Sequence, residues 1–419
     1  SKNLIDSEIL SRQLEAQGYK VVHDPQDPKG SIVIINTCGF IGDAKEESIN
    51  TILQFGELRR KHKIERLLVM GCLSGRYIKE LPTEIQEVDR YYGKFNWKEI
   101  LTDLGQSYDP KLSLERTLTT PSHYAYLKIS EGCNRFCSYC AIPIITGRHQ
   151  SRPIEDLEAE VKWLVSQGVK EFQVIAQDLS YYGMDLYHSL KLAELVERLS
   201  DIKGVEWLRL HYAYPAQFPF DVLRVMRERD NVCKYIDIAF QHISDNVLEK
   251  MHRHVTSKET YELIGRIREE VPGVHVRTTL LTGHPGETED DFNQLMEFVQ
   301  KARFERMGAF PYSEEEGTYS AEHYKDDIPF EVKQERVDRI MEAQEEISRE
   351  INQQKVGKVM KVIIDREESD FFVGRTQFDS PEVDPEVLIS KNKDLKIGEF
   401  YPILITGAED YDLYGELKD

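Results

Sequence analysis

The sequence predicts an α/β multidomain protein: an amino-terminal doubly wound parallel sheet, a central open (β/α)6 partial TIM barrel and a carboxyl-terminal five-stranded β-barrel. Apolar runs alternate with helical stretches up to about residue 355, a pattern typical of parallel sheets covered by helices. Beyond that point only short β-like stretches separated by turn residues remain, which indicates a small barrel. Residues 105–122 have the composition of a linker. We therefore expect domains at 1–112, 119–355 and 356–419.

The amino-terminal region begins with a helical stripe over residues 3–18, after which we expect a short strand. Two continuous apolar runs follow, SIVIINTC (31–38) and RLLVMGC (66–72), and they end in Cys38 and Cys72. Open parallel sheets bind ligands just beyond the carboxyl ends of their strands, so both cysteines are placed to hold one. From composition alone, two such cysteines are buried core thiols about as often as they are ligands.

The central region contains six apolar runs separated by helical stretches. They are YAYLKI (124–129), QVIA (173–176), VEWLRLH (205–211), YIDIAF (235–240), VHVRTTLL (274–281) and RMGAF (306–310). Six β/α units are fewer than the eight of a closed barrel, so the sequence predicts an open one with functional loops at the carboxyl ends of its strands.

Directly after the first of these strands come Cys133, Cys137 and Cys140, spaced C-x3-C-x2-C. Three thiolates on one loop can bind three irons of a cubic cluster and leave the fourth iron open, whereas ferredoxin loops supply four cysteines. The open iron would accept a small chelating ligand. A zinc site or three unrelated thiols are the alternatives, although zinc sites more often use paired C-x2-C motifs.

Charge and cysteine content narrow the class of protein. The 54 basic and 74 acidic residues give a net charge of -20, which opposes nonspecific nucleic-acid binding. Six cysteines in 419 residues are too few for a disulfide framework. The chain shows no signal peptide and no apolar run near the ~20 residues that span a bilayer, so we expect a cytoplasmic protein without a membrane partner.

Several motifs together resemble the methylthiotransferase family of radical S-adenosylmethionine enzymes over essentially the whole chain. They are INTCGF (35–40), MGCLSGRY (70–77), SEGCNRFCSYCAIP (130–143), SRP (151–153) and PYSEEEGT (311–318). The resemblance implies two 4Fe-4S clusters, one held by Cys133, Cys137 and Cys140 and an auxiliary one held by Cys38 and Cys72. It also implies S-adenosyl-L-methionine as cofactor and a TRAM domain at the carboxyl end.

In the family a third auxiliary cysteine stands in a G-C-x-K-N context, which would place it immediately before Ser1. We therefore expect the chain as printed to offer two auxiliary ligands and to hold its second cluster weakly. Cys233 matches no motif and is expected to be an ordinary buried thiol.

Four residues are candidates for binding S-adenosylmethionine. Tyr139 precedes the last cysteine of the loop and is expected to pack on the adenine; Gln177 and Asp178 end a strand and are expected to meet polar groups of the cofactor. Gly283, in TGHPGE, would allow close backbone approach. A core aromatic, helix-capping polar groups and a plain turn are the respective alternatives.

The implied reaction adds a methylthio group to an unactivated carbon, which requires hydrogen abstraction by a cofactor radical, here 5'-deoxyadenosyl. The family divides into a MiaB type, which modifies adenosine in tRNA, and a RimO type, which modifies the β-carbon of an aspartate in small-subunit ribosomal protein twelve. SKNLIDSE (1–8) and PYSEEEGT resemble the RimO type. A non-enzymatic cluster carrier is the other class of answer, but a carrier has no use for an open iron. The sequence identifies neither the electron donor nor the sulfur donor.

The carboxyl-terminal domain should favour a protein substrate over tRNA. Between Gly357 and Asp419 eight Lys and Arg face fifteen Asp and Glu, a net charge of -7, which would repel phosphates and attract a basic ribosomal protein. The expected docking face consists of acidic residues in the first half of the domain: Glu367, Glu368, Asp370, Asp379, Glu382, Asp384 and Glu386.

Overall fold

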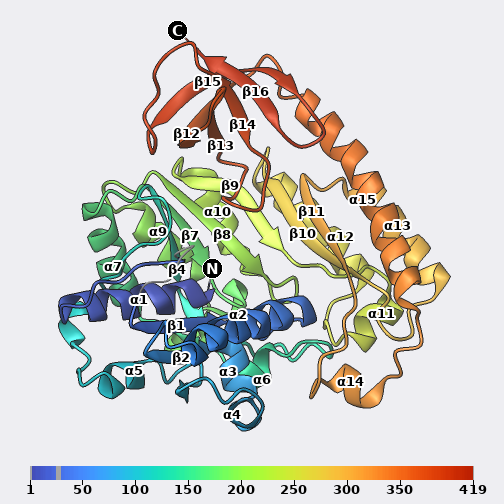
Figure 1. Ribbon diagram of the computed structural model, residues 1–419. Coiled ribbons are helices and arrows are strands. Elements are labelled where there is room, and N and C mark those ends of the chain that lie inside the picture. Colours follow the sequence, from blue (N-terminus) through green and yellow to red (C-terminus); the bar gives the residue numbers. More distant parts are fainter. Residues whose placement is uncertain (1, 25–29, 419) are drawn as a thin grey trace. The chain divides into compact units, whose positions relative to one another are not determined.

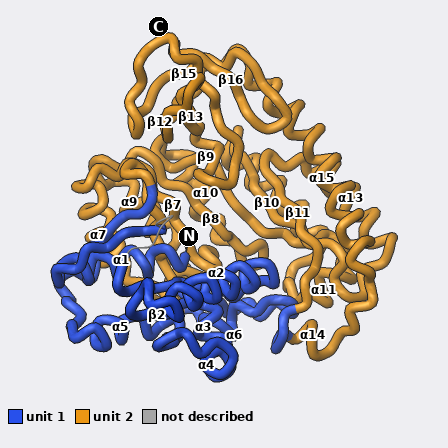
Figure 2. Tube along the Cα trace, viewed as in Figure 1, with its two compact units in different colours: residues 1–120, 131–149, 315–318 blue, residues 121–130, 150–314, 319–419 orange. Residues whose placement is uncertain are grey.

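The computed structural model describes residues 2–24 and 30–418 (Figure 1) and divides into two compact units (Figure 2). Unit 1 comprises residues 1–120, 131–149 and 315–318, and unit 2 comprises residues 121–130, 150–314 and 319–419. The three-cysteine loop therefore belongs to the same unit as the amino-terminal region. None of the described helices combines the length and apolarity needed to cross a bilayer.

Unit 1 is built on a three-stranded parallel sheet in the order β1-β2-β3. Leu67 and Val69 of β2 pack with Ile52 of α2, whereas Leu68 and Met70 pack with residues of α1 and α5. Alternate side chains of β2 are thus buried on opposite faces, which explains its continuous apolar pattern. The elements are α1 (Lys2–Ala16), β1 (Ile32–Thr37), α2 (Gly42–Arg60), β2 (Arg66–Gly71), α3 (Cys72–Arg76), α4 (Leu81–Glu84), β3 (Arg90–Tyr91), α5 (Lys98–Asp103), η1 (Pro110–Leu112) and α6 (Ile142–Thr146).

Two expectations for this unit were wrong. No strand follows Gly18 within residues 19–24, and residues 25–29 lie outside the described part of the chain. The segment 105–122 has the composition of a linker but is held against α1 over part of its length: Arg116 pairs with Glu8 at 3.1 Å, and both side chains are buried. A polar composition shows only that a segment lacks an apolar pattern. It does not show whether hydrogen bonds or ion pairs hold that segment in place.

Unit 2 contains a six-stranded parallel sheet in the order β11-β10-β9-β8-β7-β4, in which the strands lie in the order of the chain, and this confirms the open partial barrel. Its strands are β4 (Tyr124–Lys128), β7 (Glu171–Ile175), β8 (Trp207–Ala213), β9 (Val232–Ile238), β10 (His275–Thr282) and β11 (Arg306–Pro311). The short strands β5 (Ser130–Glu131) and β6 (Gln150–Ser151) flank the cysteine loop.

The helices of unit 2 are α7 (Ile154–Ser166), η2 (Leu179–Tyr181), α8 (Met184–Tyr187), α9 (Leu192–Ser200), α10 (Asp221–Glu228), α11 (Asp245–Lys250), α12 (Ser257–Glu270), α13 (Glu289–Ala302), α14 (Tyr319–His323) and α15 (Phe330–Gln353). Thr256 and Thr288 begin α12 and α13 with capping boxes, in which the threonine hydroxyl and an acidic side chain satisfy the first backbone N–H groups.

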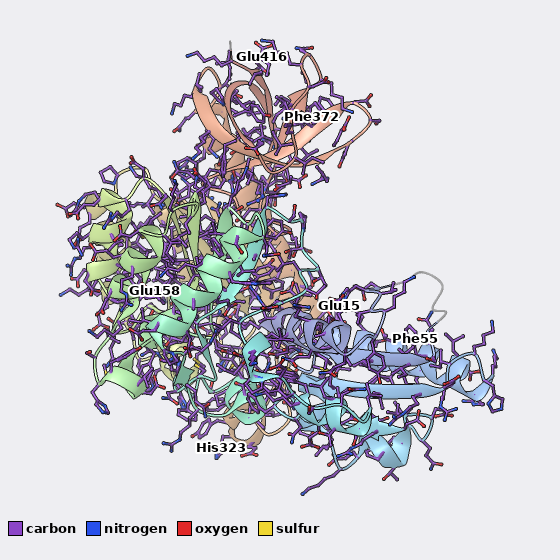
Figure 3. The ribbon with its side chains drawn as sticks, turned by 90° about the vertical axis from the view of Figure 1, so that its left-hand side faces the viewer. Glu15, Phe55, Glu158, His323, Phe372 and Glu416 are labelled. Carbon is purple, nitrogen blue, oxygen red and sulfur yellow. The ribbon has the colours of Figure 1, made fainter. Side chains whose placement is uncertain are left out.

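The carboxyl-terminal segment closes into a five-stranded barrel in the order β12-β13-β14-β16-β15, as predicted. Its strands are β12 (Val359–Glu367), β13 (Phe371–Thr376), β14 (Val387–Ser390), β15 (Phe400–Ala408) and β16 (Leu413–Leu417). Phe372 is buried within the apolar interior, whereas Glu416 is exposed on the outside (Figure 3).

This barrel is attached to the amino ends of the half-barrel strands by buried ion pairs. Glu171, the first residue of β7, accepts hydrogen bonds from Arg209 at 3.0 Å and from Arg375 at 2.7 Å. Arg375 also pairs with Asp365 at 2.6 Å. All three partners of this central pairing, Glu171, Arg209 and Arg375, are almost completely buried.

The same interface corrects the expected docking face. Asp379 is 1% exposed and pairs with Arg306. Asp384 accepts a hydrogen bond from the Tyr235 hydroxyl at 2.7 Å, and Glu382 accepts hydrogen bonds from the hydroxyls of Tyr124 and Tyr126. All three acids bind the half-barrel, but Glu382 is also exposed. Asp379 and Asp384 were wrongly placed on a surface for a partner, because their sequence context does not reveal the arginines and the tyrosine opposite them.

Candidate active site

Cys38 and Cys72 follow neighbouring strands at one edge of the unit 1 sheet. Thr37, the last residue of β1, is the register partner of Gly71, the last residue of β2. Because the strands are parallel, the two cysteines that come next leave the sheet side by side. Cys38 is exposed and Cys72 is partly buried, and both are thiols. The structure therefore brings together the two cysteines that the sequence singled out in this region.

A glycine on either side of this pair allows the two backbones to approach closely. A Cβ atom on Gly39 would lie 2.6 Å from the Leu73 nitrogen and 2.9 Å from the carbonyl carbon of Cys72. Gly71 has φ +106°, and a Cβ there would lie 2.5 Å from the Thr37 carbonyl oxygen. A side chain fits at neither position without moving backbone. Both glycines stand in the motifs INTCGF and MGC, but only the packing explains why they are needed.

Sequence reasoning missed the polar groups behind the cysteine pair. The Asn3 amide donates to the Cys72 sulfur at 3.3 Å and to the Thr37 carbonyl at 3.0 Å. The Lys94 ammonium donates to Asn3 Oδ1 at 2.9 Å, and Lys94 is 4% exposed. Asn3 lies in the family motif, so its importance had a signal in the sequence. Lys94 had none.

These groups act on the protonation of Cys72. Burial raises the pKa of the Cys72 thiol, and the charge of the nearby Cys38 raises this pKa further. The Lys94 ammonium and the Asn3 amide both act in the opposite direction and lower it. The cation and the N–H donor favour the thiolate, which is the form that binds a metal.

The three-cysteine loop is fixed at its neck by backbone contacts. The Cys133 N–H donates to the Gly147 carbonyl at 3.2 Å, and the His149 N–H donates to Asn134 Oδ1 at 3.2 Å. Gly132 has φ +82°, and a Cβ there would lie 2.2 Å from the Arg148 carbonyl oxygen. The loop therefore closes on itself just before its first cysteine.

The two cysteine groups belong to elements that contact each other. Helix α3 begins at Cys72 and contacts α6, which begins two residues after Cys140. At the carboxyl end of α3, Arg76 donates to the Gly39 carbonyl at 3.1 Å and to Glu315 at 2.9 Å. Glu315 also pairs with Lys45 of α2 at 2.8 Å. The PYSEEEGT motif thus supplies a buried carboxylate that binds cations on α2 and α3.

The candidate cofactor residues fall in both units. Tyr139 is partly exposed on the cysteine loop of unit 1 and is not part of the buried core. In unit 2 the Asp178 carboxylate accepts a hydrogen bond from the Ser180 N–H at 2.8 Å and caps η2, while Gln177 beside it is partly buried. Gly283 has φ +72°, donates to Glu287 at 2.7 Å, and would clash with Lys333 if it carried a Cβ. Capping and a tight turn are thus sufficient structural reasons for Asp178 and Gly283.

The chemistry of the donor set fits iron-sulfur clusters. Thiolates are the ligands that iron-sulfur clusters use in proteins. Three thiols lie within eight residues of one pinned loop, and two more emerge at a strand edge beside a cation and an amide N–H. Such thiolates bind separate irons of a cluster, and N–H donors to the sulfurs tune it.

Comparison with known proteins agrees with this organisation. The radical SAM superfamily matches residues 127–299, the TRAM domain matches residues 356–417, and uncharacterized protein family UPF0004 matches residues 1–93. Two solved structures of the radical S-adenosylmethionine methyltransferase TsrM from Kitasatospora setae share the fold. They have TM-scores of 0.52 and 0.54 at 14% and 13% identity, covering 85% and 88% of this chain and 75% and 76% of theirs.

Much closer relatives cover the whole chain. "Ribosomal protein uS12 methylthiotransferase RimO" of Phocaeicola vulgatus is 66% identical over 100% of this chain and 97% of its own length. The proteins of that name from Bacteroides thetaiotaomicron and Christiangramia forsetii are 65% and 52% identical, over 100% and 99% of this chain and 96% and 92% of their own lengths. The motifs, the fold and this identity over the full length lead to one conclusion: the chain belongs to the RimO family of radical SAM methylthiotransferases.

Proposed function

We propose that this chain transfers a methylthio group to an aspartate side chain of ribosomal protein uS12. Its cofactors are S-adenosyl-L-methionine and two 4Fe-4S clusters. The work is divided among an amino-terminal domain (1–112), a radical SAM domain (119–355) and a TRAM domain (356–419). Because the proposed substrate is a ribosomal protein, we expect the reaction to take place in the cytoplasm.

One observation carries the proposal: the loop with three cysteines and the pair Cys38 and Cys72 lie in the same compact unit. Cys133, Cys137 and Cys140 would hold the cluster that cleaves S-adenosylmethionine, and the other two cysteines would hold the auxiliary cluster. When bound, the first cluster supplies an electron and the second supplies a site for sulfur. An electron carrier alone would supply four cysteines to such a cluster and would have no use for an open iron.

The chain's own residues would prepare these two sites. The pinned neck at Gly132 holds the first cysteine of the loop in place. At the other site the close packing at Gly39 and Gly71 sets the spacing of the thiols, and Asn3 donates to a ligand sulfur. Tyr139, Gln177 and Gly283 are proposed to contact S-adenosylmethionine, with Asp178 shaping the strand end.

Cysteine substitutions test the proposal by separating two activities. Alanine at Cys133, Cys137 or Cys140 should abolish formation of 5'-deoxyadenosine from S-adenosylmethionine under anaerobic conditions with dithionite, because the loop would no longer bind three irons and leave the fourth open for the cofactor. Cys38→Ala and Cys72→Ala should keep that cleavage and lose methylthio transfer, measured by mass spectrometry of uS12. Normal transfer by the Cys72→Ala protein would refute the auxiliary assignment, and normal uS12 modification in cells that lack the gene would refute the substrate.

The acidic barrel supplies a smaller docking surface than the sequence suggested. Glu367, Glu368 and Asp370 are exposed at the β12–β13 hairpin, in contrast to the acids that bind the half-barrel. We expect these carboxylates to steer a basic ribosomal protein by long-range attraction, so their effect should weaken as salt shortens the Debye length from about 10 Å at 0.1 M.

A further inference from the structure

Lys94 is a buried lysine between β3 and α5 that has no assigned role in the proposed reaction. It is 4% exposed and has three oxygen partners: Asn3 Oδ1 at 2.9 Å, Asp6 at 3.5 Å and Glu131 at 3.5 Å. A buried ammonium is costly unless charged or polar groups surround it. These partners come from α1 and from the neck of the three-cysteine loop, so Lys94 contacts the supports of both cysteine groups.

On the auxiliary side, Lys94 determines how the Asn3 amide is oriented. An ammonium can only donate, so it must take the amide oxygen, which leaves the amide nitrogen for acceptors. That nitrogen donates to the Cys72 sulfur and to the carbonyl of Thr37, the residue before Cys38. A metal-bound Cys72 has no proton to donate, so the Asn3 N–H is the hydrogen bond that remains between them.

On the other side, Lys94 pairs with Glu131, which lies in β5 two residues before Cys133. Gly132 between them packs directly against the Arg148 carbonyl. Because this glycine leaves the backbone no room to shift in that direction, a fixed Glu131 side chain also fixes the start of the loop. A continuous series of contacts therefore runs from Cys72 through Asn3, Lys94 and Glu131 to the neck of the loop.

We propose that Lys94 is a positioning residue that joins the Cys38 and Cys72 site to the three-cysteine loop and raises the reduction potential of the cluster bound at Cys38 and Cys72. A cluster gains negative charge on reduction, so a nearby cation and an N–H donor to a ligand sulfur stabilise the reduced state. This inference rests on the proposed function, since it requires a cluster at those two cysteines.

A buried ion cluster that only stabilises the fold would give a different result on substitution. Lys94→Arg keeps the positive charge, Lys94→Met removes it at similar length, and Glu131→Gln removes the carboxylate through which Lys94 pairs with the neck of the loop. Lys61, an exposed lysine at the end of α2 that pairs with Glu57 at 3.7 Å, provides the matched control Lys61→Met. The double variant K94M/E131Q avoids leaving Glu131 as an uncompensated buried charge if the single Lys94→Met protein folds poorly.

The test uses the full chain after anaerobic reconstitution. Iron content, and a redox titration followed by electron paramagnetic resonance with the three loop cysteines replaced by alanine, report the auxiliary cluster alone. Hydrogen exchange of residues 131–149 in the chain with its loop cysteines intact reports the loop. Lys94→Met and K94M/E131Q should shift the auxiliary potential to more negative values and speed exchange several-fold. Lys94→Arg should retain most of the potential, Glu131→Gln should speed exchange without making the potential more negative, and Lys61→Met should change neither.

Two failures are distinguishable. If the chain that keeps Lys94 binds no iron once its three loop cysteines are replaced, the proposed auxiliary site fails and this inference falls with it. If the cluster is present and Lys94→Met leaves both potential and exchange unchanged, or if Lys94→Arg is as impaired as Lys94→Met, the inference alone is overturned.

Discussion

Buried charges lie in two regions: at the amino ends of the half-barrel strands in unit 2 and at the carboxyl ends of the sheet strands in unit 1. The thiols in these two regions have different surroundings. Cys233 lies in β9 near its amino end, packed against Trp207 and Tyr235. Burial raises the pKa of its thiol to about 12. Cys72 is partly buried beyond the end of β2, and there a cation and an amide N–H act against the effect of burial.

The charges at the two positions therefore have different partners: other charges at the amino ends of the strands, and polar groups beside thiols at the carboxyl ends. At the amino ends, Glu171, Arg209 and Arg375 neutralise one another and attach the small barrel. At the carboxyl ends, Lys94 and Asn3 surround thiols that remain able to bind a ligand. In α/β barrels the amino ends of the strands generally serve stability, and open parallel sheets bind ligands beyond the carboxyl ends of their strands.

The largest expected effect is on stability at the amino ends. Glu171→Gln leaves two buried arginines without their common carboxylate, and breaking such a pair typically costs about 3–5 kcal/mol. Thermal unfolding of the unsubstituted protein and of the Glu171→Gln variant measures this loss of stability. The control Glu206→Gln removes an exposed carboxylate that pairs with Lys361 at 3.3 Å. If Glu171→Gln lowers the free energy of unfolding no more than this control does, the buried ion pairs do not stabilise the fold as proposed.

The pH dependence of that variant sharpens the same comparison. Burial alone would raise the pKa of Glu171, but Arg375 and Arg209 more than offset it, so the pKa is lowered below its ordinary value near 4.5. The stabilisation is therefore complete above about pH 4.5 and is lost as the pH falls through the lower value in the folded state. Glu171→Gln should lack this part of the acid sensitivity in unfolding experiments between neutral and acidic pH.

An intermediate effect is expected at the carboxyl ends. Gly39→Ala places a Cβ against the backbone of Cys72 and Leu73, and relieving such overpacking typically costs about 1–3 kcal/mol. Because the shift separates Cys38 from Cys72, iron bound at the auxiliary site should fall more than stability does. Gly265→Ala on the exposed side of α12 has no atom within 4 Å of its new Cβ and should be neutral or stabilising. Equal iron content in both variants would argue against the role assigned to Gly39.

The smallest effect should come from the thiol that is buried for packing. Cys233→Ala removes one sulfur from an apolar cluster and should cost on the order of 1 kcal/mol, with iron content and S-adenosylmethionine cleavage unchanged. Iron analysis of this variant beside Cys72→Ala makes the comparison direct. A loss of iron on replacing Cys233 would mean that the two regions are not separated as described.

Sequence patterns anticipated most of the fold because they record local physics. The apolar runs of β1 and β2 indicated a sheet buried on both faces, and the packing of Leu67 and Leu68 on opposite faces agrees with this. The segment 105–122 was misread, because nothing local in its composition shows that Arg116 meets Glu8. Of the acids assigned to docking, Asp379 and Asp384 were misplaced for the same reason.

The sequence by itself determined the order of the domains, the two cysteine groups and the family, since spacing and hydrophobic period are written into neighbouring residues. Only the tertiary structure decided which charges are shared between distant segments. Lys94 meets Asn3 across 91 positions of sequence, and Arg375 meets Glu171 across 204. A buried charge is stable only where chain folding brings its partner, and no local pattern encodes a partner that far away.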